Sequence, residues 1–88
     1  MILDPLTILD VKKRIGKLVK LMRKKEGLTQ DALAVKLSMS RITIQNLESG
    51  KNATLDTLLK VMQYVDLMEN LNTFIEDQSL NNSYESLY

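Results

Sequence analysis

The stretch Leu28–Asn52 reads LTQDALAVKLSMSRITIQNLESGKN and holds two short amphipathic helix patterns separated by a few polar residues. Thr29 and Ser40 precede the two patterns, and such residues are favoured N-caps because their hydroxyls accept hydrogen bonds from free helix amides. Gly50 follows the second pattern, where glycine readily takes the left-handed conformation that ends a helix. We therefore expect two helices and a connecting turn, at residues 30–37, 41–49 and 38–40.

A longer amphipathic helix is expected before this pair, over residues 11–26. Asp10 is a suitable N-cap, and the basic residues before Gly27 are typical of a helix C-terminus. Gly16 lowers the helix propensity of this segment and suggests that another helix packs closely there. The expected buried stripe has the spacing of one helix face and consists of Val11, Ile15, Leu18, Val19 and Met22.

Two more segments follow the pair. Thr54 is the expected N-cap of a helix over residues 55–65. Its predicted buried stripe consists of Leu55, Leu58, Leu59, Met62 and Val65. Residues 67–76 carry apolar side chains at helical spacing, but the run from Thr73 to Ile75 is equally compatible with a short strand. Both interpretations of this segment stay open at this stage.

The fold class predicted from these patterns is all-α, a compact bundle of four or five short helices. The 88 residues have the length of one domain. We divide the chain into an extended lead-in, a domain and a flexible tail, at residues 1–9, 10–76 and 77–88. A domain this small buries only about 60% of the surface of its unfolded chain, so a second subunit is expected to add stability.

The composition excludes several classes of site. The chain has no Cys and no His, so it contains no disulfide, no thiolate or imidazole metal ligand, and no Cys or His nucleophile. The sequence shows no phosphate-binding glycine loop and no partnered carboxylates, so we expect no enzymatic activity, no metal and no cofactor. It also lacks an apolar run of about 18 residues and a signal peptide, which predicts a cytoplasmic protein without a membrane span.

Charge is unevenly distributed along the chain. Residues 12–51 hold eleven Lys and Arg against three acidic residues, whereas residues 52–88 hold one Lys against six acidic residues. A basic segment followed by an acidic one suggests a face that binds a polyanion and a second surface of different character. An ordinary solvated helix face with scattered lysines is the alternative interpretation.

Two short helices joined by a turn of three or four residues form a helix-turn-helix. The second helix of such a motif fits the major groove of B-DNA, and its N-terminal residues reach the base edges. Here Ile44 and Leu47 would anchor that helix on the core, which leaves its polar face outside. The first helix would cross the DNA backbone and present its N-terminal amides to a phosphate.

The segment from Ile15 to Leu67 resembles the Xre/Cro-type helix-turn-helix domain of phage repressors and bacterial regulators. Gly-Leu-Thr-Gln, then Leu-Ala, then Ile-x-x-Leu-Glu-x-Gly-Lys carry the resemblance, within LMRKKEGLTQDALAVKLSMSRITIQNLESGKNATLDTLLKVMQYVDL. It implies a lambda-repressor-like fold and DNA binding. Ser38 departs from the family pattern, which usually has Gly at this turn position, and positive φ there costs a non-Gly residue about 1 kcal/mol.

The resemblance implies base-reading roles at the start of the second helix. Arg41 is expected to bond a guanine bidentately, and Ile42 to touch a thymine methyl group. Gln45 lies one turn further on and is expected to reach a second base. Arg41 is also compatible with a solvated surface cation, and Ile42 with the core.

Further residues are expected to contact the DNA backbone. Gln30 resembles the phosphate-contacting glutamine that begins the first helix of the motif. The other expected contacts to phosphate or sugar are Ser40, which is chiefly a cap, Thr43, Asn46, Lys51 and Asn52. Glu48, by contrast, is expected to form a structural ion pair with Arg23, because the family commonly pairs these two positions.

The apolar residues after Asp66 exceed what one small core needs. The family binds mostly as dimers to palindromic sites, so we expect a homodimer on a palindromic double-stranded operator. The predicted interface consists of Leu67, Met68, Leu71, Phe74 and Ile75. An ordinary core role is the alternative.

Within this family the chain most resembles the HipB-like antitoxins. VKLMRKKEGLTQ, NATLDTLLKVMQYVDLMENL and a polar tail ending in an aromatic residue carry this resemblance. It implies a nucleoid-associated dimer that represses its own operon and binds a HipA-type kinase toxin. In that subfamily the segment after the fourth helix can be an intersubunit strand, and the tail can dock on the toxin. The tail residues implied here are Tyr84, Leu87 and Tyr88.

Two alternatives remain beside a dimeric autorepressor with a toxin partner. One is a stand-alone phage-type or metabolic repressor, which would have no kinase-like gene beside its own. The other is a protein-interaction module that has the same fold and does not bind DNA. A DNA-binding protein with about six phosphate contacts loses affinity on the order of 10³-fold between 50 and 200 mM salt, which distinguishes it from such a module.

Overall fold

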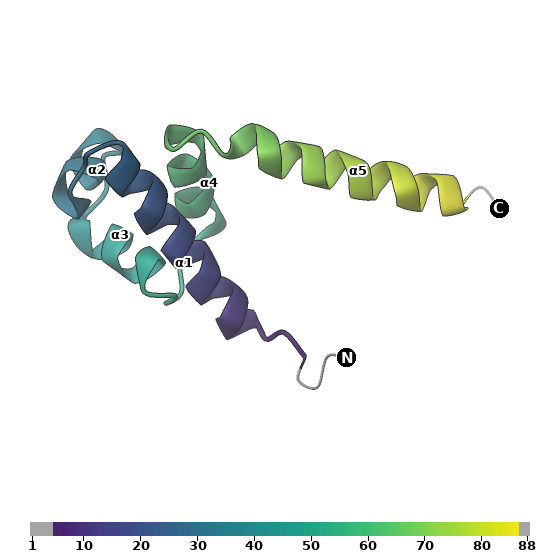
Figure 1. Cartoon of the computed structure of the whole chain (residues 1–88), viewed down its shortest axis with the longest axis horizontal. Coiled ribbons are helices and arrows are strands. Elements are labelled where there is room, and N and C mark those ends of the chain that lie inside the picture. The colour runs from purple at the N-terminus through teal and green to yellow at the C-terminus, as the bar shows by residue number, and fades with distance from the viewer. Residues whose placement is uncertain (1–4, 87–88) are drawn as a thin grey trace.

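The computed structural model describes the backbone of residues 5–86 and the side chains of residues 5–83, and all regular structure in this part is helical (Figure 1). The helices are α1 (Ile8–Lys25), α2 (Gln30–Lys36), α3 (Arg41–Glu48), α4 (Leu55–Tyr64) and α5 (Met68–Ser86). The predicted all-α class is therefore confirmed. Residues 68–76 belong to a helix, so the strand interpretation of this segment is wrong. None of the described helices is long and apolar enough to cross a membrane.

The helices begin at side-chain caps, and one predicted cap is wrong. The hydroxyls of Thr29, Ser40 and Thr54 accept a backbone hydrogen bond at the starts of α2, α3 and α4, as expected. At α1, however, Thr7 is the N-cap, and Asp10 is the third residue of the helix. The Thr7 hydroxyl accepts from the Asp10 amide at 3.0 Å, and the Thr7 amide donates to the Asp10 carboxylate at 3.0 Å. Because this reciprocal capping box satisfies two free amides, α1 begins at Ile8, before the predicted start.

The core is formed where α1 to α4 meet. Its buried side chains are Val19, Leu33, Ala34, Ile44, Leu47, Val61 and Val65. Periodicity did not single out Val61, which is fully buried. Conversely, Val11, Leu18 and Leu55 were predicted to be buried and are 39%, 41% and 71% exposed. The reason is that the apolar stripes of α1 and α4 are wider than the core they share, so their outer edges face solvent.

Gly16 lies where α1 and α3 cross closely. A Cβ atom at this position would lie 2.8 Å from the Leu47 carbonyl oxygen and 2.7 Å from the Glu48 carbonyl carbon, and would also overlap the Glu48 carbonyl oxygen. Such distances are well inside van der Waals contact, so a larger residue would force the two helices apart. The close packing suggested by the sequence is therefore present.

α5 leaves the bundle beside α4 and extends away from α1, α2 and α3 (Figure 1). The radius of gyration is 15.5 Å, whereas a compact chain of this length is expected to have a value of about 12 Å. The segment 77–86, predicted to be a flexible tail, continues this helix. The distal part of α5 is thus a polar helical arm with exposed side chains at Leu80 and its neighbours.

Replacing Gly16 by Ala should destabilise the fold, although alanine is intrinsically the better helix former by about 1 kcal/mol. Separating α1 from α3 should cost about 1–3 kcal/mol, as overpacking typically does. Urea denaturation followed by far-UV circular dichroism measures this change. Lys17→Ala, at the exposed neighbouring position, is the control. A Gly16→Ala protein as stable as the control would contradict the close crossing.

Candidate nucleic-acid interface

The turn between α2 and α3 sets the relative orientation of the two helices. Ser38 has φ of 55°, the left-handed conformation expected at this position. The amide of Met39 donates to the carbonyl of Ala34 at 2.8 Å, which satisfies one free carbonyl at the end of α2. The two helices then pack against each other and form a helix-turn-helix, with α3 at the molecular surface.

α3 is anchored on one side and open on the other. Ile44 and Leu47 are 0% and 5% exposed and fix the helix to the core. Arg41, Ile42 and Gln45 are all exposed on the outer side. Ile42, with 65% of its surface exposed, is therefore not a core residue in this structure, which removes the ordinary explanation for an isoleucine at this position.

Ser40 and Thr43 form the hydrogen-bonded start of α3. The Ser40 hydroxyl accepts from the Thr43 amide at 3.2 Å, and the two hydroxyl oxygens are 2.9 Å apart. Ser40 is therefore a cap, as predicted. This bonding fixes the first turn of α3, which carries Arg41 and Ile42. DNA contacts by the two hydroxyls stay predictions.

A hollow lined by several hydroxyl and amide side chains lies beside α3, where the loop after it meets the start of α4. The hollow measures about 430 Å³ and brings the predicted residues Thr43, Asn46 and Asn52 together with Thr54 and Thr57. Hydroxyl and amide groups of this kind are common partners of DNA phosphates. The sequence pattern identifies Thr54 only as a helix cap, so its place in this hollow becomes visible only in the tertiary structure.

The loop that follows α3 is held by contacts to α1 and α3. The Lys51 amide donates to the Asn46 carbonyl at 2.9 Å, and the Lys12 ammonium donates to the Asn52 side-chain oxygen. The side chains of Lys51 and Asn52 are both exposed. Lys12 was missed as a site residue, because it lies 40 positions before Asn52 and no local pattern links the two.

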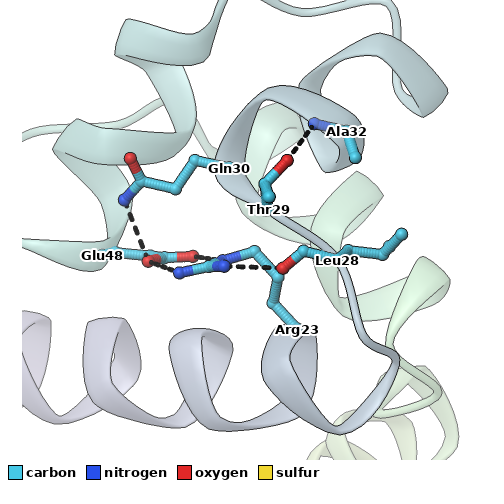
Figure 2. A network of polar contacts seen from close by, with 6 residues as sticks. All are labelled: Arg23, Leu28, Thr29, Gln30, Ala32 and Glu48. Atoms are coloured by element: carbon cyan, nitrogen blue, oxygen red, sulfur yellow. Dashed lines mark hydrogen bonds and ion pairs between the residues drawn. The ribbon is translucent and has the colours of Figure 1, made fainter.

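A buried ion pair lies beneath the start of α2, and Figure 2 shows its arrangement. The Arg23 Nε and Nη2 atoms donate to the two Glu48 carboxylate oxygens at 2.6 and 2.9 Å, and Nη1 donates to the Leu28 carbonyl at 2.7 Å. The side chains of Arg23 and Glu48 are only 7% and 4% exposed. The pair implied by the family resemblance is therefore formed, and it joins α1, the loop before α2, and α3.

Gln30 takes part in the same network. Its side-chain nitrogen donates to a Glu48 carboxylate oxygen at 3.1 Å. In Figure 2 the Gln30 side-chain oxygen points away from Glu48. The buried Glu48 carboxylate thus holds the Gln30 side chain in place at the N-terminus of α2. The predicted phosphate contact of Gln30 is not tested by this arrangement and would have to use its remaining N–H or the helix amides.

The Helix-turn-helix family model matches residues 19–67 of the sequence. The chain belongs to this family. The matched segment contains α2, α3 and α4 and the last seven residues of α1. Helix-turn-helix domains place the second helix of the motif in the major groove of DNA, and in this chain the corresponding helix is α3.

One curated protein that resembles this chain is an antitoxin. Antitoxin HipB of Escherichia coli (strain K12) is 36% identical over 55 residues, which cover 61% of this chain and 62% of that protein. The helix-turn-helix chain thus aligns with less than two thirds of the relative's length. The resemblance to HipB-like antitoxins noted from the sequence is confirmed.

A second surface of the helix-turn-helix domain is an apolar groove between α1, α4 and α5. It measures about 420 Å³ and has no polar lining. Its walls include Ile15 and Leu18 of α1, Leu55, Leu59 and Met62 of α4, Leu67 just before α5, and Leu71 and Ile75 of α5. Three residues of the predicted dimer interface line this groove. Of the other two, Met68 is half-buried and Phe74 is 60% exposed.

The predicted toxin-binding tail lies at the edge of the described structure. The backbone of Tyr84 belongs to α5, but its side chain lies outside the described part. Leu87 and Tyr88 lie outside the described residues altogether.

The hydrogen-bond network of Arg23, Glu48 and Gln30 shifts the pKa values of Arg23 and Glu48. Burial raises the pKa of Glu48, but hydrogen bonds from Arg23 and Gln30 oppose this and leave the pKa below its usual value of 4.5. The hydrogen bond with Glu48 raises the pKa of Arg23. Glu48 is therefore held as a carboxylate at neutral pH and acts as a structural charge.

Replacing Glu48 by Gln should destabilise the domain by about 3–5 kcal/mol, because it leaves the buried Arg23 charge unpaired. The pH profile should change as well. A carboxylate whose pKa is lowered by folding contributes stability that is present above pH 4.5 and lost as pH falls through the folded pKa. Acid denaturation should therefore be shallower for Glu48→Gln than for the wild type.

Urea denaturation between pH 7 and acidic pH measures both effects. Glu69→Gln, which changes an exposed carboxylate of α5, is the matched control. Equal stability of Glu48→Gln and the control at neutral pH would contradict the structural role of the pair.

Proposed function

We propose that the protein is a sequence-specific, dimeric DNA-binding repressor that acts as the antitoxin of a toxin–antitoxin operon. The observation that carries the DNA-binding part is the exposed N-terminal face of α3 in a chain of the helix-turn-helix family. Ile44 and Leu47 hold this helix rigidly. Its outer residues are therefore pre-positioned, and little entropy is lost when they contact DNA.

The reading face combines base contacts with backbone contacts. Arg41 would bond a guanine, Ile42 would contact a thymine methyl group, and Gln45 would reach a further base. Contacts to phosphate or sugar would come from Gln30, Ser40, Thr43, Asn46, Lys51 and Asn52. The basic segment 12–51 supplies the attraction to the DNA polyanion, which should make binding strongly dependent on salt.

Dimerisation would use the apolar groove between α1, α4 and α5. The groove presents no polar surface, and Ile75 in its wall and the neighbouring Phe74 are 50% and 60% exposed. Leaving this surface in water is costly, and a second copy would cover it with identical residues about a two-fold axis. Two α3 helices would then reach half-sites about 34 Å apart on a palindromic operator.

The proposal of a toxin partner rests on the similarity to HipB, whose name identifies it as an antitoxin. By that similarity the partner would be a HipA-like kinase, and the protein would repress its own operon in the cytoplasm, associated with the nucleoid. The end of α5 and the residues after it, with Tyr84, Leu87 and Tyr88, would contact the toxin. A stand-alone repressor would have the same reading face, and a kinase-like gene beside its own distinguishes the two.

The DNA-binding proposal predicts specific binding in a gel-shift titration. The protein should shift a duplex from the region upstream of its own gene in the presence of excess random duplex. Arg41→Ala should weaken this binding by about 1–3 kcal/mol, because one bidentate base contact is lost. Lys60→Ala removes the same charge from α4 and is the control. Equal, weak binding of the wild type to both duplexes would favour an interaction module instead.

The dimer proposal predicts that a charge in the groove separates the subunits. Ile75, which lines the groove and is 50% exposed, tolerates a polar residue in a monomer. Ile75→Glu should therefore fold and sediment as a monomer of 10.1 kDa, whereas the wild type should sediment at twice that mass. Leu80→Glu, on the same helix and outside the groove, is the control and should remain dimeric. A monomeric wild type at DNA-binding concentrations would reject the interface.

A further inference from the structure

We propose that Asp31 is a positioning residue that sets the sequence specificity of Arg41. The Arg41 Nε atom lies 3.9 Å from the Asp31 Oδ1 atom, and the two side chains are 59% and 74% exposed. The pair therefore stands on the outer surface of the helix-turn-helix, where α3 begins. The inference rests on the proposed DNA-binding function, and it concerns a residue outside the predicted reading face.

The fold brings these two residues together from separate helices. Asp31 is the second residue of α2, and Arg41 is the first residue of α3. The left-handed Ser38 and the cap by Ser40 determine how α3 leaves the turn. The Asp31 carboxylate also lies in the first turn of α2, where the helix dipole favours negative charge. Asp31 thus places a negative charge beside Arg41, the first residue of α3.

The chemistry of arginine explains what such a neighbour does. A guanidinium carries five N–H donors in one plane, and a guanine O6/N7 edge uses two of them. If the carboxylate attracts the Nε side of Arg41, the two terminal nitrogens remain available for a base. An unrestrained arginine would spread over many rotamers and would reach phosphates as readily as bases. The carboxylate therefore favours the base-reading orientation.

The same carboxylate also disfavours non-specific binding. It places a negative charge next to the DNA, where it repels phosphates and partly cancels the Arg41 charge in backbone-only complexes. Both effects act in one direction. They raise the ratio of specific to non-specific affinity, and they leave overall affinity for DNA little changed or lower.

The test compares Asp31→Asn with the wild type in full-length protein. Selection from a randomised duplex library identifies the preferred duplex of the wild type. Dissociation constants are then measured at one salt concentration for that duplex, for a copy in which the preferred guanine pair is replaced, and for a random duplex. Asp31→Asn should reduce the discrimination at that guanine by about two- to fivefold, the effect expected of one exposed ion pair. Affinity for the random duplex should stay the same or rise.

Three controls separate positioning from a simple charge effect. Asp77→Asn removes an equal charge from an exposed position of α5 and should leave the discrimination unchanged. In the Arg41→Ala background, Asp31→Asn should have no further effect on the discrimination, because the residue it orients is absent. Asp31→Glu retains the charge and should keep most of the wild-type discrimination.

Unchanged discrimination in Asp31→Asn, or an equal loss with and without Arg41, would overturn this role of Asp31 while leaving the proposed repressor intact. A wild-type protein that selects no sequence from the library would reject the DNA-reading function itself. The two failures are therefore distinguishable in one set of titrations.

Discussion

The buried pair of Arg23 and Glu48 is the interaction on which the arrangement of the helix-turn-helix depends. It joins the end of α1, the loop before α2 and the end of α3, and Gln30 adds the first turn of α2. A buried ion pair contributes little net stability compared with apolar packing, but its directional hydrogen bonds admit few alternative arrangements. Its role here is to fix the position of three helix ends relative to one another.

The close crossing of α1 and α3 at Gly16 and the burial of Ile44 and Leu47 complete this constraint. The ion pair at Glu48 holds the C-terminal end of α3, and the buried side chains of Ile44 and Leu47 hold the rest of the helix. Its exposed first turn therefore has a defined orientation, which base recognition requires. The surface between α1, α4 and α5 differs from the exposed face of α3, because it contains an apolar groove that is open in the single chain.

Much of the fold was predictable from short stretches of sequence. Thr29, Ser40 and Thr54 cap their helices as expected, and Ser38 takes the left-handed conformation of the turn. These features depend on atoms within about four residues of one another, so local rules suffice. The first cap was predicted at Asp10 and is observed at Thr7. This error is local, because both side chains can accept the required hydrogen bond and only the complete capping box distinguishes them.

The sequence by itself determined the helices, the turn and the family of this protein, and the resemblance it carries implied the Arg23–Glu48 pair. Only the tertiary structure decided which apolar stripes are covered: Val61 is buried, whereas Leu18 and Leu55 face the open groove. It also decided which distant polar residues meet, such as Lys12 with Asn52 and Asp31 with Arg41. Helical periodicity records that a side chain is apolar or polar, but the neighbour it meets depends on how whole helices pack.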